Sequence, residues 1–296
     1  MDTTRSVEPV DIARVVTDAR PGTDIVEIVE RTGGQLSTVY EVRTDSDPLI
    51  VKVYAPEWAW KQAKEVHVYG LLEEELSGSI PRVVHVGDSV TILTKLDGVP
   101  LSELEPPDWR ATYTQLGQLL ARIHRIGQPE YGYLTDQILD PLPDNEQYMD
   151  RQFAKKLGEF EQLGGDAKLQ AKIAAYVAQH RHLFADNEAA VLCHNDFHEG
   201  NVLVDPDTWR VTGFIDVENA IAADPLIDIA KTIQYSAHDN AEKLAGLADG
   251  YGDLPAERTD LYRLYHSLEL WDWFQSIGET TYLDSIARDM EQLVAP

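Results

Sequence analysis

The sequence predicts an α+β fold of two lobes, a small β-rich lobe followed by a larger helical one. Apolar and polar residues alternate over 24–53 and again over 82–96, which is typical of half-buried strands. After residue 98 the apolar spacing becomes helical. The chain of 296 residues exceeds an average single domain, so two packed lobes are the natural expectation.

The first part of the N-terminal lobe is predicted to hold one short helix and three strands. Residues 9–19 have helical spacing, with their apolar residues on one side. The strands are expected where apolar and polar residues alternate, at 24–32, 38–45 and 48–55. Turn-forming residues separate them, first Gly33-Gly34 and then the run of Asp, Ser and Pro at 45–48.

A helix and two further strands complete this lobe. The helix is predicted over 57–76, and the strands over 82–87 and 90–96. Asp97-Gly98 follows as a loop signal, so we place a hinge near 94–98. We therefore divide the chain into an N-terminal lobe at 1–96 and a C-terminal lobe at 97–296.

Helices dominate the predicted C-terminal lobe. Leu116, Leu119, Leu120 and Ile123 follow helical spacing, and further helices are expected at 145–163, 167–185 and 256–277. A compact strand-loop-strand section is expected at 190–216. The chemistry-bearing residues gather in that section.

The charge balance narrows the classes of function. The chain has 51 Asp and Glu against 25 Lys and Arg, a formal net charge of −26, which disfavours nucleic acid as a partner. The acid could attract a cationic substrate, or it could adapt the surface to high salt. Because acidic residues occur along the whole chain, we favour a salt-adapted, halophilic surface.

The sequence shows no targeting signal and only one cysteine. No apolar run has the length of a membrane-spanning helix, and the N-terminus lacks a basic segment followed by an apolar stretch. Cys193 is the single cysteine, so an intramolecular disulfide and a multi-Cys metal site are excluded. We expect a cytoplasmic protein with no membrane partner; oligomeric state has no signature in the sequence.

The most informative stretch is VLCHNDFHEGNVLVD, residues 191–205. Two apolar strands flank a polar loop, whose functional candidates are His194, Asp196, His198 and Asn201. A third strand then delivers Asp216. Phosphoryl transfer needs magnesium on the phosphates, a group that orients the acceptor hydroxyl, and a cation on the α/β-phosphates. Magnesium favours oxygen ligands, which one Asn and one Asp would supply.

Four motifs carry a resemblance to a known family. The loop HNDFHEGN resembles the H-x-D-x-x-x-x-N loop of the aminoglycoside phosphotransferase and choline kinase-like family of small-molecule kinases, which are relatives of protein kinases. Ile215-Asp216 looks like the family's Ile-Asp, and Glu218 matches a frequent Glu two residues on. DPLIDIA at 224–230 and LLARIHRI at 119–126 are similar to two further family segments. All four occur in the expected order.

The resemblance implies a protein-kinase-like two-lobed fold, with a small antiparallel-sheet N-lobe, a larger helical C-lobe and a nucleotide cleft between them. It implies an ATP- and magnesium-dependent enzyme that phosphorylates a hydroxyl of a small molecule of the aminoglycoside, amino alcohol, homoserine or sugar type. Asp196 would be the catalytic base, and Asn201 and Asp216 would bind Mg²⁺. His194 would brace the loop, and Asp228 would tie its backbone to a helix.

The N-terminal lobe should supply a lysine and a partner glutamate. Lys52 lies in the middle of the apolar run LIVKVY, where an unpaired lysine would be costly. Glu65, in the following helix, is the best candidate partner, although its position would also suit a solvated residue.

The nucleotide-binding loop and the hinge have weaker signals. Gly33-Gly34 is followed by Ser37 and Thr38, whose hydroxyls and backbone N–H groups would meet the phosphates, yet a plain hairpin turn explains the glycines equally well. At the hinge, the backbone of Thr94 and Leu96 would bind adenine, an expectation that rests on position alone.

Three alternatives compete with this interpretation. His194 and His198, with Glu199 beside them, could bind zinc on a helix, but the order differs from the metalloprotease motif, and Gly200 favours a loop. A kinase-like protein could bind nucleotide without catalysis, although all the expected residues are present. A protein kinase would carry a long activation segment after Asp216, which this sequence lacks.

The acceptor pocket has only loose candidates. Acidic and aromatic side chains of the C-terminal lobe could surround an amino or quaternary-ammonium alcohol. These are Glu199, Glu218, Trp271, Asp272 and Trp273. Trp271, however, lies on an apolar helix stripe, and surface adaptation already explains most acids.

Overall fold

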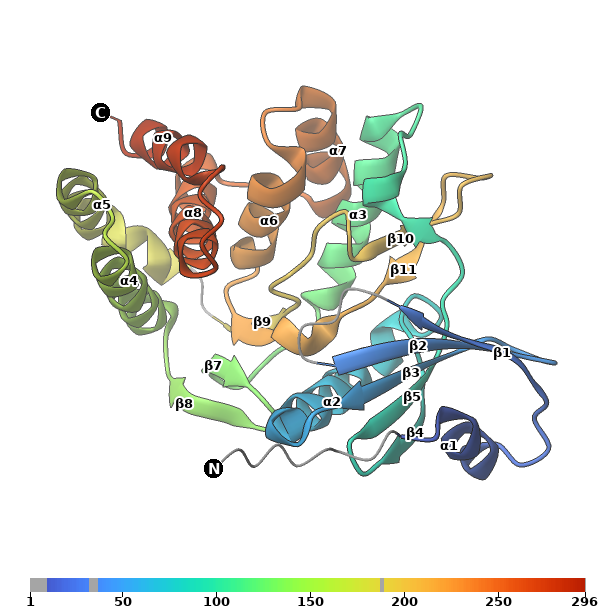
Figure 1. Cartoon of the computed structure of the whole chain (residues 1–296). Coiled ribbons are helices and arrows are strands. Elements are labelled where there is room, and N and C mark those ends of the chain that lie inside the picture. The colour runs from blue at the N-terminus through green and yellow to red at the C-terminus, as the bar shows by residue number, and fades with distance from the viewer. Residues whose placement is uncertain (1–9, 32–36, 187–188, 296) are drawn as a thin grey trace, which may run out of the picture.

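The computed structural model describes residues 10–31, 37–186 and 189–295 (Figure 1). The expected turn at Gly33-Gly34 lies outside the described residues. In Figure 1 the N-terminal sheet occupies one side of the molecule and the helical part the other, which confirms the expected two-lobed α+β fold. The lobe boundary at residue 96 stays a prediction.

The N-terminal lobe is built on a five-stranded antiparallel sheet of order β1-β2-β3-β5-β4. Its elements are α1 (Ile12–Ala19), β1 (Ile25–Arg31), β2 (Ser37–Thr44), β3 (Leu49–Tyr54), α2 (Ala59–Leu76), β4 (Val83–Gly87) and β5 (Val90–Thr94), with a 3₁₀ turn at Pro56–Trp58. Ile12 and Val16 of α1 pack on Val42 and Leu49 in a small core of their own.

Helix α2 joins the two lobes. Its buried residues Val68, Leu72 and Leu76 belong to the large core of the C-terminal lobe, not to the small core under α1. Burial of apolar side chains is the main favourable term in such packing. The helix that carries Glu65 is therefore held against the helical lobe.

The C-terminal lobe is mainly helical. Its helices are α3 (Trp109–Ile123), α4 (Asn145–Gln162), α5 (Ala167–His180), α6 (Leu226–Thr232), α7 (Ala241–Tyr251), α8 (Ala256–Ser276) and α9 (Leu283–Leu293). Asp108, Asp144, Asp166 and Asn240 cap α3, α4, α5 and α7 by accepting backbone N–H groups of the first turn. A π-helical turn at Ile233–Ala237 extends α6, and 3₁₀ turns lie at Leu101–Glu103, Arg181–Asp186 and Val217–Asn219.

Two small antiparallel sheets hold the central loops of this lobe. The strands are β6 (Val99–Pro100), β7 (Tyr131–Leu134), β8 (Ile138–Leu142), β9 (Val191–Cys193), β10 (Val202–Val204), β11 (Val211–Phe214) and β12 (Ile221–Ala223). Their orders are β11-β10-β6 and β8-β7-β12-β9. The loop at 194–201 leaves β9 and enters β10, so both ends of the loop are fixed by strand pairing.

The sequence misses some elements and boundaries. The β7–β8 hairpin and β12 were not expected, because strands of three to five residues are too short for alternation to stand out. The helix expected at 167–185 ends at His180 and continues as a 3₁₀ turn. Across the described residues, every helix is too short or too polar to cross a lipid bilayer.

Helices α3 and α7 approach closely because glycines line their contact. A Cβ on Gly117 of α3 would lie 2.7 Å from the backbone nitrogen of Tyr251. On α7, a Cβ on Gly250 would collide with the carbonyl oxygen of Thr114. Side chains longer than hydrogen would force the two helix backbones apart.

We predict that Gly250→Ala lowers the free energy of unfolding by about 1–3 kcal/mol, since the methyl group has no space. Gly158→Ala is the matched control: it also lies inside a helix, but its Cβ would meet nothing within 4 Å. That substitution should raise stability by about 0.5–1 kcal/mol through helix propensity. Urea denaturation of both variants measures the difference, and equal effects would contradict the close packing.

Asp272 is a buried carboxylate in α8. Its burial raises the pKa from the ordinary value of 3.8 to about 7, although the Lys156 ammonium, 3.9 Å from Oδ2, acts in the opposite direction. The folded protein therefore binds this proton more tightly than the unfolded chain. The contribution of Asp272 to stability is full below pH 3.8 and declines as pH rises to 7.

We expect Asp272→Asn to raise the free energy of unfolding by about 1–3 kcal/mol at pH 8 and to change it little at pH 4. Thermal denaturation of the variant and the parent protein across this range tests the expectation. Asp253→Asn, at an exposed position, is the control. A stability difference that does not depend on pH would show that the pKa of Asp272 is the same in the folded and unfolded states, which contradicts the raised pKa.

Candidate active site

A cleft of about 1140 Å³ lies where the two lobes meet. The N-terminal sheet contributes Lys52 and Thr94 to its lining, and the C-terminal lobe contributes Asp196, Asp216 and Lys231. Lys52, Asp196 and Asp216, which were expected from separate motifs, thus face one space.

Lys52 of β3 and Glu65 of α2 form an ion pair at the back of the cleft. Lys52 Nζ lies 2.6 Å from Glu65 Oε1 and 3.8 Å from Asp216 Oδ1. Glu65 is fully buried and also accepts the hydroxyl of Tyr54. Burial alone would lower the Lys52 pKa, but Glu65 and Asp216 more than offset it and raise the pKa, so the lysine stays charged. The pair therefore places a cation beside Asp216.

Asp228 of α6 anchors the loop at 194–201. Its carboxylate accepts the backbone N–H groups of His194 at 2.7 Å and Asn195 at 2.6 Å. His124, at the end of α3, donates from Nε2 at 3.1 Å. Burial would raise the Asp228 pKa, but the hydrogen bond from His124 leads the effects that lower it overall. The ionised carboxylate thus fixes a loop in which Asn195 has a φ of 57°.

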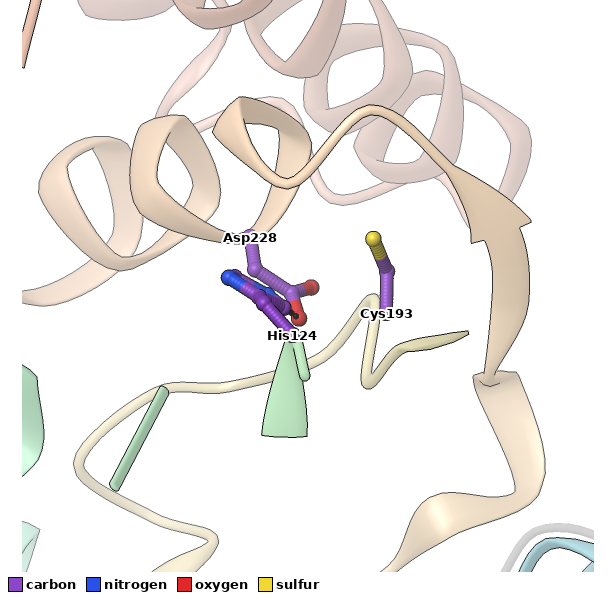
Figure 2. Close-up of side chains that lie close together, drawn as sticks. All are labelled: His124, Cys193 and Asp228. Atoms are coloured by element: carbon purple, nitrogen blue, oxygen red, sulfur yellow. Dashed lines mark hydrogen bonds and ion pairs between the residues drawn. The ribbon is translucent and has the colours of Figure 1, made fainter. Parts of the chain in front are cut away.

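Figure 2 shows that the side chains of His124, Cys193 and Asp228 lie close together, in a grouping that could suggest a metal site. Each side chain already has a partner: Tyr251 O–H lies 2.8 Å from His124 Nδ1, and Cys193 Sγ donates to the Asp224 carbonyl at 3.5 Å. Burial raises the Cys193 pKa well above the ordinary value, whereas a metal needs the thiolate. We assign these residues to the loop anchor.

The side chain of His194, the first residue of the loop, connects two segments of the site. Its Nε2 donates to the Ile215 carbonyl at 3.1 Å, and its Nδ1 accepts the backbone N–H of Asp196 at 3.2 Å. Both ring nitrogens are engaged, so the imidazole connects Asp196 to the segment that carries Asp216. The same geometry weighs against zinc binding by His194 and His198, since the loop between β9 and β10 is not helical.

Asp196 faces the cleft within a set of amide and cationic groups. Asn201 Nδ2 donates to the Asp196 carbonyl at 2.9 Å, and Asn219 Nδ2 donates to Oδ2 at 3.3 Å. Lys231 Nζ lies 3.7 Å from Oδ1, and His198 Nε2 lies 3.8 Å from it. Burial lowers the His198 pKa, although Asp196 acts in the opposite direction.

Asp216 follows β11 with left-handed backbone angles, φ 67° and ψ 62°. Non-glycine residues adopt this conformation rarely, and it occurs at functional sites that the surrounding structure holds in place. Here the backbone N–H of Ile215 donates to the Asn201 carbonyl at 2.9 Å. The two candidate magnesium ligands thus belong to neighbouring, hydrogen-bonded segments.

The expected nucleotide-binding residues are only partly brought together. Ser37, Thr94 and Leu96 line the cleft. Thr38 is exposed and lies outside that lining, because successive residues of β2 point to opposite faces of the sheet. The sequence interpretation had assigned Ser37 and Thr38 together to a phosphate-binding loop, whereas both belong to β2.

The acceptor candidates also separate. Trp273 and Glu218 line the cleft, and Trp273 is 44% exposed. Trp271 packs in the core, its ring centroid 4.4 Å from that of Phe160. Glu199 accepts the hydroxyl of Tyr113 at 2.5 Å and pairs with Lys243 at 2.7 Å. Its carboxylate is therefore engaged inside the C-terminal lobe.

Four functional candidates escaped the sequence interpretation. His124 lay within a motif that was noticed, but its contact with Asp228 was not. Asn219, Lys231 and Glu269 follow no motif that was used, and they reach the cleft only through the fold.

Comparison with known proteins agrees with this geometry. The model of the phosphotransferase enzyme family matches residues 27–268. A proposed ketoamine kinase of Vibrio parahaemolyticus is 27% identical over 264 residues, 82% of this chain and 85% of the relative. Streptomycin 3''-kinase of Streptomyces griseus is 29% identical over 159 residues, 51% of this chain and 56% of that enzyme.

Solved structures share the fold across nearly the whole chain. A thermostable mutant of aminoglycoside phosphotransferase APH(4)-Ia, in a ternary complex with ADP and hygromycin B, has a TM-score of 0.72 at 17% identity, covering 96% of this chain and 98% of its own. A proposed fructosamine-3-kinase of Thermobifida fusca has a TM-score of 0.67 at 22% identity, covering 95% and 99%. The resemblance expected from the catalytic-loop motif is confirmed, and the chain belongs to the phosphotransferase enzyme family of small-molecule kinases.

Proposed function

We propose that the protein transfers the γ-phosphoryl group of ATP to a hydroxyl of a small molecule, with Asp196 as the catalytic base. One observation carries the proposal: Lys52, Asp216 and Asp196 line the same cleft between the lobes. A cation for the phosphates, a carboxylate for magnesium and a carboxylate for the acceptor hydroxyl are what this reaction requires. The complete set favours catalysis over the non-catalytic alternative.

Asn201 and Asp216 would hold Mg²⁺. Asn201 donates from Nδ2 to the Asp196 carbonyl, which leaves its Oδ1 for a cation, and Asp216 adds a partly exposed carboxylate. These are the hard oxygen ligands that magnesium prefers. Bound magnesium would neutralise charge on the phosphates. This donor set fits the ion.

The nucleotide would lie against the N-terminal sheet. Lys52, oriented by Glu65, would contact the α/β-phosphates, with Ser37 nearby on β2. The backbone of Thr94 and Leu96 would face the adenine. The complexes of APH(4)-Ia with ADP and with AMP-PNP support nucleotide binding by this fold. His194 would hold Asp196 in register with Asp216.

We further propose a ketoamine-type acceptor. Glu269 at the acceptor end is already paired with Lys231 and His266, and Lys231 would repel a polycation such as an aminoglycoside. Tyr235 and Trp273 line the same space, and aromatic side chains suit a sugar-like body. The proposed ketoamine kinase of Vibrio parahaemolyticus, which matches over most of both chains, supports this choice.

The surface charge bears on working conditions. A net charge of −26 in a cytoplasmic enzyme would be tolerated best where salt screens the repulsion. We therefore infer a salt-adapted protein, whose activity should be assayed at both low and molar potassium chloride.

Asp196→Asn should lower kcat at least ~100-fold, because the amide cannot accept the proton of the acceptor hydroxyl. The dissociation constant of magnesium-ATP should change less than about twofold, since Asp196 lies on the acceptor side. Steady-state kinetics and calorimetric titration measure the two effects.

Asp207→Asn, in the exposed turn after β10, is the matched control and should keep the parent rate. An Asp196→Asn variant with near-normal turnover would remove Asp196 from the mechanism.

A further inference from the structure

Lys231 is a buried lysine that reaches the catalytic carboxylate from α6. It lies one turn after Asp228, and its side chain lines the cleft. Its Nζ is 3.7 Å from Asp196 Oδ1, 3.2 Å from Glu269 Oε2 and 5.0 Å from the centre of the Tyr235 ring. The cation therefore sits between a residue of the proposed chemistry and a wall of the acceptor space.

Lys231 is held charged in that position. Burial alone would lower its pKa, but Glu269 leads a set of effects that raise it, followed by Tyr235 and Asp196. Glu269 itself is fixed from α8, where His266 Nδ1 lies 3.0 Å from the same carboxylate oxygen. A buried charge with such partners has little freedom to turn away from Asp196.

The other lysine and arginine side chains that line the described part of the cleft are paired with carboxylates other than Asp196. Among the described residues that line it, Lys52 is paired with Glu65, while Arg31 and Lys95 are paired with Glu41 in the N-terminal sheet. The loop at 194–201 contains no Lys or Arg. Among the described Lys and Arg residues that line the cleft, Lys231 is thus the one whose ammonium lies within 4 Å of the Asp196 carboxylate.

We propose that Lys231 is a positioning residue for Asp196. Its ammonium attracts Oδ1, while the amides of Asn219 and Asn201 lie 3.3 and 3.4 Å from Oδ2. Contacts on both oxygens fix the plane of the carboxylate, so that it meets the acceptor hydroxyl in one orientation. This inference rests on the proposed role of Asp196.

A purely structural role would make a different prediction. If Lys231 serves only to neutralise the half-buried Glu269, its loss should cost stability, and removal of both charges should restore stability and rate together. If it positions Asp196, removal of both charges should restore stability alone. The double variant therefore separates the two roles.

The experiment compares Lys231→Met, Lys231→Arg and the double variant Lys231→Met with Glu269→Gln. We expect Lys231→Met to lower kcat ~10- to 100-fold with the KM for ATP changed less than about twofold. Lys231→Arg should recover at least ~10-fold, because it keeps the positive charge. The double variant should regain the thermal stability of the parent yet remain as slow as Lys231→Met.

Lys156→Met is the control, since Lys156 is also a largely buried C-lobe lysine paired with a glutamate, Glu159 at 2.7 Å, but does not line the cleft. It should keep the parent kcat. Recovery of kcat in the double variant, or a normal kcat in Lys231→Met, would overturn the inference.

The Asp196→Asn background separates this inference from the proposed function. There, Lys231→Met should have no further effect on the residual rate, because the group it positions is gone. A full additional loss would mean that Lys231 acts independently of Asp196, which overturns the inference. If Asp196→Asn alone proves active, the proposed function fails first.

Discussion

The carboxylate of Asp228 is the contact on which the arrangement of the active site depends. It accepts two consecutive backbone N–H groups of the loop at 194–201 and one ring N–H from α3, and so joins three segments far apart in the sequence. Because this carboxylate is fully buried, loss of any one donor would leave its charge less well compensated. The anchor holds the positive φ of Asn195 and, through His194, sets the distance between the loop and the Asp216 segment.

A second constraint relates the two lobes. Glu65 binds Lys52 of the sheet, yet the helix that carries Glu65 is packed into the core of the C-terminal lobe. The position of Lys52 over the cleft is thus coupled to packing between α2 and the helical lobe. Lys231 plays a comparable part on the acceptor side, where α6 carries both the loop anchor and the cation beside Asp196. One short helix therefore organises the backbone and the charge of the proposed base.

Much of this could be predicted from the sequence, and the rest depends on tertiary contact. The two-lobed fold follows from a change in apolar period. The motifs placed Lys52, Asp196 and Asp216, which line one cleft, and Asn201, whose amide donates to the Asp196 carbonyl, although their individual roles stay predictions. Lys231 and Glu269 could not be identified as site residues from the sequence, because they pair with each other only where α6 packs against α8. Thr38 was expected in a loop beside Ser37, and its place on β2 outside the cleft lining follows from strand pairing that the motif did not reveal. Trp271 was correctly suspected of being core.

Direct assay of phosphoryl transfer tests the central claim. The γ-phosphate of ATP would be followed with and without magnesium, at low and molar potassium chloride, against a ketoamine, aminoglycosides, amino alcohols, homoserine and sugars. The account predicts magnesium-dependent phosphorylation of an acceptor hydroxyl, fastest with the ketoamine. Preferred turnover of an aminoglycoside would contradict the proposed acceptor, and failure to bind magnesium-ATP in either salt would contradict the kinase mechanism itself.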